Sequence, residues 1–361
     1  MADRSTGCRE GARMAAAKRP SVKDVAALAG VAVGTVSNVL NRPDIVAEPT
    51  RRAVEDAIAA LGFTRNESAR QLRAGASRSI AMVVMDVGNP FFTDLYVGAE
   101  GFALERGYSI QLGNSGNSGD REQRQLAAFE QQRVRGVLLA PLAGAGAVVE
   151  RLREHGIPTV LVDRVASDLE ACSVAVDDVE GGRLAVGHLI AERHRRIAFV
   201  GGPADLQQIR DRVEGARLAI AEAAASGAGE VQLDILPVER LSAGDGRDAA
   251  ERIVARPADE RPTAVFAAND LLALGLLQGF VTAGLRVPED IALIGYDDID
   301  FAATAAVPLS AVRQPRREIG YAAGELLFRE IEDLEVGAPH VHQHVRFVPE
   351  LVVRRSSSPT A

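Results

Sequence analysis

Short apolar runs alternate with longer amphipathic segments from residue 79 to about residue 313. The runs are nearly continuous in apolar residues, as buried parallel strands are, and include SIAMVVMDV (79–87), PTVLVDR (158–164), RIAFVGG (196–202) and IALIGYDD (291–298). Segments with helical periodicity separate them, such as FFTDLYVGAEGFALERG (91–107) and RDRVEGARLAIAEAAA (210–225). Strands that alternate with helices predict doubly wound parallel sheets. Two such series, roughly 79–176 and 177–313, are too long for one sheet, so we predict two α/β lobes with a cleft between them.

The stretch SVKDVAALAGVAVGTVSNVLN, residues 21–41, has a different pattern. Its apolar positions form two helical stripes, Val22, Val25, Leu28 and Ala29 in the first and Val36, Val39 and Leu40 in the second. Gly30, between the stripes, can adopt the positive φ that ends a helix sharply. A third amphipathic segment follows over residues 48–63. This spacing predicts an all-α helix-turn-helix head, whose second helix enters the major groove of DNA. The alternative is a three-helix module without a DNA partner.

The predicted second helix leaves one face for contact with DNA. The residues on this face are Val33, Gly34, Thr35, Ser37, Asn38 and Asn41. Such small polar and apolar groups can meet base edges, thymine methyl groups and phosphates.

The distribution of charge agrees with a nucleic-acid-binding head. The net charge of the chain is −8, but residues 1–78 carry 13 Lys and Arg against 8 Asp and Glu, and the remaining residues carry 28 against 41. A basic head on an acidic body indicates that only the head meets a polyanion. No apolar run reaches 18 residues and the first 20 residues lack the apolar core of a signal peptide, so we expect a cytoplasmic protein without a membrane partner. The two cysteines, Cys8 and Cys172, fit a reducing compartment.

Between these regions lies RNESARQLRAGAS, residues 65–77, with one large apolar side chain, Leu72, between Arg70 and Arg73. Too few apolar positions recur for this segment to bury a face by itself.

Motifs of catalysis and of metal binding are weak. The chain has no GxSxG, HExxH or CxxC motif, and the glycines of GNSGNSGD (113–120) fit no phosphate-binding loop. His340, His342 and His344 alternate, so on a strand they would share one face and could bind a metal. Because no Cys or carboxylate clusters locally, we favour a solvated strand or crossover. We therefore expect no catalytic residue, no metal and no cofactor.

Several motifs in order resemble those of the lactose-repressor/galactose-repressor (LacI/GalR) family of bacterial transcription regulators. The resemblance covers about residues 20–355 and rests on VKDVAALAGVAVGTVSNVLNRP, NPFF, GGP, RVEG, AAND, VPEDIALIGYDD, VRQP and PELVVRRS. It implies a homodimer that binds a pseudo-palindromic DNA operator, with a core like a periplasmic sugar-binding protein. An effector that binds between the lobes would change the affinity for the operator, so a repressor that is not an enzyme is expected.

The resemblance also implies roles for individual residues. Val33, Gly34 and Asn38 match positions that choose bases. Residues 66–74 match a hinge helix, in which Leu72 wedges between base pairs while Arg70 and Arg73 lie near phosphates. The matching effector-binding positions are Phe91, Phe92, Asp163, Arg212, Asn269, Asp297 and Gln314. Five of them follow apolar runs, and ligands of doubly wound sheets bind beyond the carboxyl ends of strands.

The expected boundaries follow from the same matches. We assign residues 1–19 to a disordered tail, 20–65 to the head, 66–78 to a hinge helix and linker, 79–355 to the core and 356–361 to a tail. Within the core, the first lobe takes about 79–176 and 314–340, and the second takes about 177–313 and 341–355. One departure from the family is Ala32, where a serine that caps the recognition helix is common. The absence of a long heptad segment after PELVVRRSSSPTA favours dimers over tetramers.

Alternatives remain open for the cleft. An aromatic wall beside Arg212 and Asp297 suits a small hydroxylated ligand, so a sugar or sugar derivative leads. A purine or nucleoside is second and a phosphorylated coregulatory protein third. Phe92 could be a core residue only, Asp163 and Arg164 could be a surface pair, and Asp297 with Asp298 could cap the next segment. A sugar-binding protein without a regulatory role is the alternative for the core as a whole.

Overall fold

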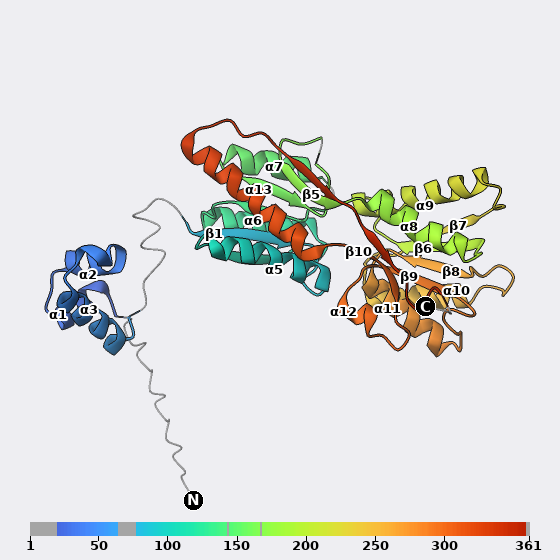
Figure 1. Cartoon of the computed structure of the whole chain (residues 1–361), viewed down its shortest axis with the longest axis horizontal. Coiled ribbons are helices and arrows are strands. Elements are labelled where there is room, and N and C mark those ends of the chain that lie inside the picture. The colour runs from blue at the N-terminus through green and yellow to red at the C-terminus, as the bar shows by residue number, and fades with distance from the viewer. Residues whose placement is uncertain (1–19, 64–76, 143, 167, 359–361) are drawn as a thin grey trace, which may run out of the picture. The chain divides into compact units, whose positions relative to one another are not determined.

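The computed structural model describes residues 20–63, 77–142, 144–166 and 168–358, which form two compact units (Figure 1). We call residues 20–63 the head and residues 77–358 the core. The predicted hinge contacts Arg70, Leu72 and Arg73 lie outside the described residues.

The head consists of three α-helices and one short 3₁₀ helix: α1 (Val22–Ala29), α2 (Val33–Asn41), η1 (Pro43–Ile45) and α3 (Glu48–Leu61). Gly30 ends α1 with a φ of 65°, and α2 is bent away from α1 by 104°. This angle is typical of a helix-turn-helix. The small core of the head is built on fully buried valines, Val25, Val36 and Val54. Within the described residues no single helix is long and apolar enough to cross a membrane, and only α1 and α2 taken together approach that length.

One expected core position of the head is wrong. Leu28 was expected in the apolar stripe of α1, yet its side chain is 56% exposed. At 100° per residue, Val22, Val25 and Ala29 define a stripe whose centre lies about 90° from Leu28. The stripe of α1 is therefore narrower than the sequence pattern indicates.

The core contains two six-stranded sheets, one in each lobe. The first has the order β11-β5-β4-β3-β1-β2 and is parallel throughout. Its strands are β1 (Ser79–Val84), β2 (Ser109–Asn114), β3 (Val137–Leu139), β4 (Thr159–Val162), β5 (Cys172–Val176) and β11 (His344–Phe347). The second has the order β12-β10-β9-β8-β6-β7, in which only β12 is antiparallel. Its strands are β6 (Arg196–Gly201), β7 (Gln232–Pro237), β8 (Ala264–Ala267), β9 (Ala292–Asp297), β10 (Ser310–Arg313) and β12 (Glu350–Val352). The predicted pair of doubly wound lobes is confirmed.

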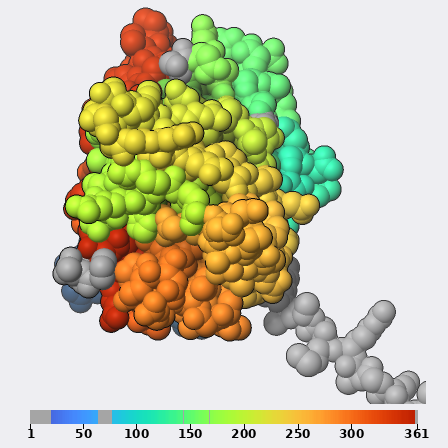
Figure 2. Space-filling view, turned by 90° about the vertical axis from the view of Figure 1, so that its right-hand side faces the viewer, coloured from blue at the N-terminus to red at the C-terminus, as the bar shows by residue number. Residues whose placement is uncertain are grey.

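Helices cover both sheets, and glycines allow some of them to approach closely. They are α5 (Pro90–Glu105), α6 (Gly119–Gln131), α7 (Ala145–Glu154), α8 (Asp178–Ala191), α9 (Gln207–Ala225), α10 (Ala243–Val254), α11 (Asp270–Thr282), α12 (Asp300–Ala303) and α13 (Arg316–Val336). In Figure 1, α13 lies along α5 in the first lobe. A Cβ atom at Gly320 of α13 would lie 1.9 Å from the carbonyl oxygen of Leu95 in α5, so only glycine fits there. Figure 2 shows the surface of the second lobe, coloured yellow-green to orange, facing the viewer.

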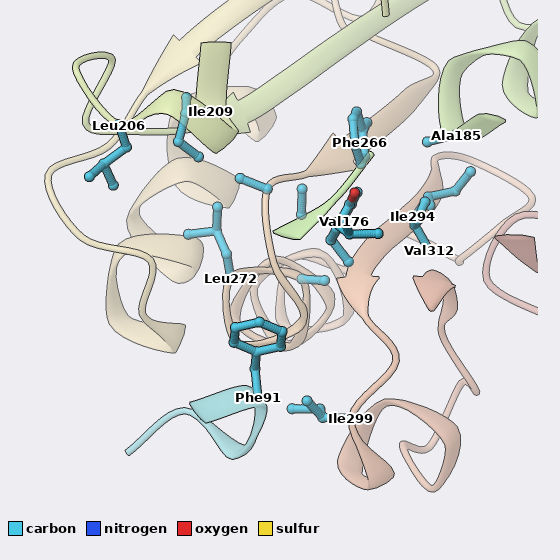
Figure 3. Close-up of a cluster of buried hydrophobic side chains, with 14 of the residues drawn as sticks. Phe91, Val176, Ala185, Leu206, Ile209, Phe266, Leu272, Ile294, Ile299 and Val312 are labelled. Carbon is cyan, nitrogen blue, oxygen red and sulfur yellow. The ribbon is translucent and has the colours of Figure 1, made fainter. Parts of the chain in front are cut away.

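The buried apolar cluster of the core includes residues of both lobes. Figure 3 shows Phe91 of α5 close to Leu272 of α11 and Ile299, beneath residues of the second sheet such as Phe266 and Ile294. The apolar packing therefore reaches the junction of the lobes, where the candidate site lies.

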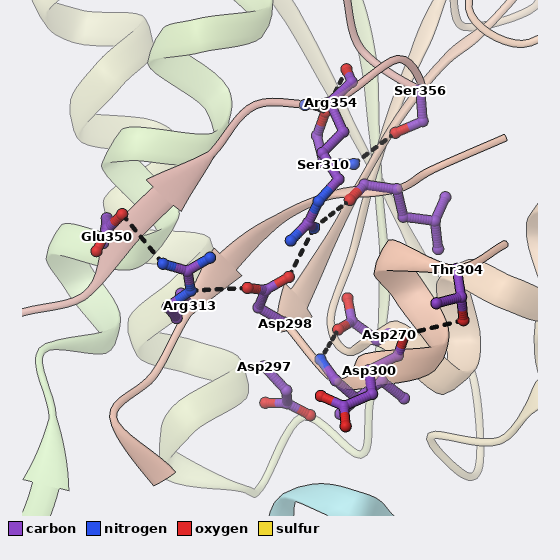
Figure 4. A network of polar contacts seen from close by, with 12 residues as sticks. Asp270, Asp297, Asp298, Asp300, Thr304, Ser310, Arg313, Glu350, Arg354 and Ser356 are labelled. Carbon is purple, nitrogen blue, oxygen red and sulfur yellow. Dashed lines mark hydrogen bonds and ion pairs between the residues drawn. The ribbon is translucent and has the colours of Figure 1, made fainter. Parts of the chain in front are cut away.

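Two assignments near the C-terminus require correction. Residues 341–355 were expected in the second lobe, but β11 (344–347) pairs with β5 in the first sheet, so the last crossing between lobes follows β11. Residues 356–358 were expected in a tail, but they are buried against the second sheet. Ser356 accepts a hydrogen bond from the Ser310 N–H (2.8 Å) and donates one to the Leu293 carbonyl (2.5 Å), as Figure 4 shows in part.

Candidate functional site

The outward face of α2 is small and uncharged. Of the six residues predicted to contact DNA, four are exposed and two, Thr35 and Ser37, are half-buried. The buried residues Val36 and Val39 fix the opposite face of the helix in the core of the head. Asn41 donates hydrogen bonds to the Ser37 carbonyl (2.9 Å) and side chain (3.2 Å). The face is thus presented by a helix whose orientation the head fixes.

The amino end of α2 lacks a side-chain cap. Ala32 is the N-cap residue of α2, and its side chain accepts no hydrogen bond. Ser21, the N-cap residue of α1, forms a capping box with Asp24. The first N–H groups of α2 therefore have no N-cap side chain to which they can donate a hydrogen bond. N–H groups at a helix start can bind phosphate oxygens. Nearby on α3, Arg51 and Arg52 form ion pairs with acidic residues one turn away, Glu55 and Glu48.

In the core, a cavity of about 350 Å³ lies between the lobes. All seven predicted effector positions line it: Phe91, Phe92, Asp163, Arg212, Asn269, Asp297 and Gln314. They come from the start of α5, the ends of β4 and β9, the N-cap of α11, the link after β10 and the helix α9. The carboxyl ends of parallel strands meet at the same edge of each sheet, which explains why separate segments converge. Their role in ligand binding stays a prediction.

Arg212 is buried and already has partners. Its side chain is 3% exposed, and Nε donates to Asp178 Oδ1 at 2.8 Å. A second guanidinium nitrogen donates to the Ala268 carbonyl, and the guanidinium lies 3.6 Å from the ring centre of Tyr296. Burial alone would lower the pKa of Arg212, but Asp178 and the neighbouring acidic groups raise it. Arg212 is therefore a fixed positive charge of the cleft wall.

Two buried carboxylates face the cavity from opposite lobes. Burial raises the pKa of Asp163 well above its ordinary value, and the charge of Asp178 adds to the effect. Burial also raises the pKa of Asp297 to about 6, although Arg212 and hydrogen bonds oppose it. Burial without full hydrogen bonding is costly for a carboxylate. Asp163 Oδ1 and Gln314 Oε1 are buried and accept no hydrogen bond among the described residues. The cavity thus offers acceptors that lack donors.

Both carboxylates occupy unusual backbone conformations. Asp163 has a φ of 59° and Asp297 a φ of 100°, a backbone region that residues other than glycine rarely adopt. Such conformations cost about 1–3 kcal/mol and cluster at functional sites. The backbone at these two positions therefore destabilises the fold slightly while it directs both side chains into the cavity.

Hydrogen bonds cross the cleft at two points. Gln208 of the second lobe donates to Asp163 of the first lobe at 3.2 Å. Asn89 of the first lobe donates to Asp297 of the second at 3.5 Å, and Gln314 donates to the same carboxylate at 2.8 Å. The sequence reasoning missed Asn89 and Gln208. Asn89 could have been found from its place before Pro90, since its side chain also caps α5, whereas no local signal marks Gln208.

The aromatic wall consists of Phe91 and Phe92, whose rings meet edge to face with centroids 5.0 Å apart. Both line the cavity and both belong to the buried apolar cluster. Phe92 is therefore both a core residue and part of the cavity wall.

The two alternative roles considered for the acidic residues, a surface ion pair for Asp163 and a helix cap for Asp297 and Asp298, are wrong. Arg164 lies 3.9 Å from Asp168, whereas Asp163 faces the cavity. Figure 4 shows Asp298 between Arg313 (2.7 Å) and Arg354 (2.6 Å). The N–H of Ile299, at the start of α12, donates to Asp270 and not to Asp297 or Asp298.

The histidines near the C-terminus do not share a strand. Only His344 lies in β11, and His340 and His342 precede it. Cys172, which is distant in sequence, and Glu330, which lies ten residues before His340 in α13, lie beside His340 and His342. The local-sequence argument against a cluster of donor atoms is therefore wrong, because the fold brings the other donors from elsewhere.

Comparisons with known proteins agree with both units. Residues 21–66 match the family described as bacterial regulatory proteins, lacI family, and residues 186–357 match the periplasmic binding protein-like domain. The chain is 34% identical over 337 residues to the HTH-type transcriptional repressor PurR of Vibrio campbellii, covering 93% of this chain and 98% of that protein. It is 34% identical to the protein of the same name from Vibrio vulnificus, with 92% and 97% covered.

Solved structures show the same architecture. The transcriptional regulator CelR–cellobiose complex is 33% identical, with a TM-score of 0.67 over 94% of this chain and 100% of that one. The lac repressor dimer bound to operator and the anti-inducer ONPF is 26% identical, with a TM-score of 0.78 over 94% and 99%. A lacI-family regulator from Enterococcus faecium with bound ribose is 29% identical, with a TM-score of 0.68 over 78% and 99%.

Proposed function

This chain belongs to the lacI family of bacterial regulatory proteins, and we propose that it represses transcription under the control of a sugar or sugar derivative. As a homodimer, it places two copies of α2 in successive major grooves of a pseudo-palindromic operator. The ligand occupies the cavity between the lobes and changes the affinity of the protein for that operator.

The observation that carries the choice of ligand is the pair of buried oxygens without hydrogen-bond partners, Asp163 Oδ1 and Gln314 Oε1, beside an aromatic wall. A sugar has hydroxyl groups that donate to such oxygens and an apolar face that packs on Phe91 or Phe92. Two similar regulators of known structure have cellobiose or ribose bound. A purine base has no hydroxyl groups to donate to these oxygens, and a purine or nucleoside is the second candidate.

The cross-cleft hydrogen bonds supply a route from ligand to DNA. Gln208 and Asn89 each join one lobe to a carboxylate of the other. A ligand that donates to Asp163 or Asp297 competes with these bonds or adds to them, so its free energy of binding depends on how the lobes are arranged. Two lobe arrangements with different operator affinities would therefore be populated according to ligand concentration.

We infer binding and not catalysis. Arg212 is held by Asp178 and by a main-chain carbonyl, and no His or Cys lines the cavity in the part of the chain that the structure describes. A regulator that acts on chromosomal DNA works in the cytoplasm, where we place this protein.

A thermal-shift screen against sugars, polyols and nucleosides tests the proposal. A ligand at 100 times its Kd raises the stability of the core by about 2.7 kcal/mol and so raises its Tm. We expect a sugar to produce this shift in the wild type and in Asp248→Asn, an exposed aspartate on α10, but not in Asp297→Asn. If only nucleosides raised the Tm, the ligand would be a nucleoside and not a sugar. An equal shift in Asp297→Asn would move the binding site away from the cleft.

A further inference from the structure

Four donor side chains meet at the far end of the first lobe from the cleft. Cys172 is the first residue of β5, Glu330 lies in α13, and His340 and His342 lie between α13 and β11. One potential ligand atom from each lies within 4.8 Å of all the others. The cleft, by contrast, lies at the carboxyl ends of the strands, so this cluster is a separate place in the fold.

The distances approach those of a tetrahedral metal site. Cys172 Sγ lies 3.2 Å from His340 Nε2 and 3.9 Å from His342 Nδ1, and Glu330 Oε2 lies 4.0 Å from His340 Nε2. Around a tetrahedral zinc ion, the ligand atoms are about 3.3–3.6 Å apart, given bonds of about 2.0–2.3 Å. Side-chain shifts of less than about 1 Å would therefore complete the geometry.

Glu330 supplies a second and independent observation. Its Oε2 atom is buried and accepts no hydrogen bond among the described residues, and it is aimed at the cluster. The ion-pair partner of Glu330 among the described residues is His340, whose Nε2 lies 4.0 Å from Glu330 Oε2, too far for a hydrogen bond. A buried carboxylate oxygen without a partner is costly, and a bound cation would remove that cost.

The surroundings also resemble an outer shell of ligands. Asp333 Oδ2 lies 2.8 Å from His340 Nδ1, so the Nδ1–H can donate to it and leave the lone pair of Nε2 directed at the cluster. The Gln343 N–H donates to Cys172 Sγ at 3.3 Å. A carboxylate that orients a histidine ligand is common at zinc sites.

We propose that Cys172, Glu330, His340 and His342 bind one divalent ion of the zinc class. Sulfur and imidazole donors favour Zn²⁺ over Mg²⁺ and Ca²⁺, which prefer oxygen. On binding, the Cys172 thiol releases its proton to solvent and the thiolate forms the bond to the metal. Four protein ligands close the site, so its role is structural: it fastens the crossover from α13 to β11 onto the first sheet. This proposal departs from the expectation of a chain without a metal.

Titration of the metal-free full-length chain tests the proposal. We would use a chain without a histidine tag and with Cys8→Ser, so that Cys172 is the only thiol. Zn²⁺ alone is titrated in competition with a chromophoric chelator, and Co²⁺ is added separately to record absorption. We expect one tight equivalent of Zn²⁺, a thiolate-to-cobalt charge-transfer band and the strong visible bands of a tetrahedral ion. Zn²⁺ should also raise the Tm.

Variants separate a metal site from a hydrogen-bonded cluster. Cys172→Ser should abolish the charge-transfer band and weaken Zn²⁺ binding more than about 100-fold, and Asp333→Asn should weaken it about 10–100-fold. His344→Gln is the matched control, because His344 contacts Ser173 and lies outside the cluster. Equal Zn²⁺ affinity in wild type and Cys172→Ser, or a Co²⁺ spectrum without a thiolate band, would overturn the proposal.

Discussion

The residues that face outward on α2 are small and uncharged, whereas those that line the cleft are larger, often charged and buried. Asn38 and Gly34 are exposed on a helix fixed by valines on its other side. Asp163, Arg212 and Asp297 are each less than 10% exposed, and the charge of each influences the pKa of the others. From this difference we expect that residues on the outward face of α2 can be replaced without loss of stability, whereas replacing a buried charged residue of the cleft wall such as Arg212 destabilises the core.

The largest effect is expected at Arg212 of the cleft. Arg212→Ala leaves the carboxylate of Asp178 buried without its partner, which costs about 3–5 kcal/mol. Denaturant unfolding of the full chain, followed in the core transition, measures the loss. Arg217→Ala, an exposed arginine on the same helix, is the control and should change the free energy of unfolding by less than about 0.5 kcal/mol. If both variants are equally stable, the ion pair between Arg212 and Asp178 does not contribute to the stability of the core.

A change on α2 should leave stability alone and reduce specific binding. Asn38→Ala removes a side chain predicted to read a base, which costs about 1–3 kcal/mol of discrimination. Fluorescence anisotropy with an operator selected from random DNA measures this loss, and binding to unrelated DNA is the control. We expect a weaker operator complex, unchanged non-specific binding and an unchanged Tm. Equal weakening on both DNAs would mean that Asn38 contacts only the backbone.

The pH dependence of ligand binding should depend on Asp297. Because burial raises its pKa to about 6, the carboxylate gains a proton as the pH falls through 6 and loses an acceptor for ligand hydroxyl groups. The affinity for the sugar should fall by about tenfold for each pH unit below 6. The same shift means that Asp297 favours folding more at pH 5 than at pH 7, since the folded state binds this proton more tightly. Calorimetric titration from pH 7 to pH 5 measures the change in affinity. An affinity independent of pH over this interval contradicts the role of an ionised Asp297.

The smallest effect is a gain of stability at the uncapped end of α2. Ala32→Ser supplies the missing N-cap hydroxyl and should stabilise the head by about 0.5–1 kcal/mol. Thermal unfolding of the head transition detects it. Ala27→Ser, an exposed position inside α1, is the control and should be neutral or slightly destabilising. If both variants raised the stability of the head equally, the added hydroxyl itself, and not its position at the N-cap, would be the cause.

Much of the fold and of the cleft could be predicted because both depend on strand ends. Apolar runs identify the strands, and ligands of doubly wound sheets bind beyond the carboxyl ends of strands, so Asp163 and Asp297, each at the end of an apolar run, were expected at the cleft. The head was predicted for a similar reason, since Gly30 and two apolar stripes describe the turn between helices.

The features that escaped prediction depend on long-range pairing. The strand β11 is short and polar, so nothing in HVHQHVRF shows that it joins the first sheet. Cys172 and His340 are 168 residues apart, and their contact exists only once β5 and the end of α13 lie together. The positive φ of Asp163 and Asp297 also has no local signal, because the surrounding structure imposes it.

The central claim is that the ligand of the cleft controls the affinity of the head for DNA. Calorimetric titration of the sugar found by the thermal-shift screen, into free protein and into operator-bound protein, tests it most directly. Linkage requires that the ratio of the two Kd values equal the factor by which the sugar changes operator affinity, typically about 5–150-fold. We predict two different Kd values with this ratio. Equal Kd values on and off the operator would contradict the account.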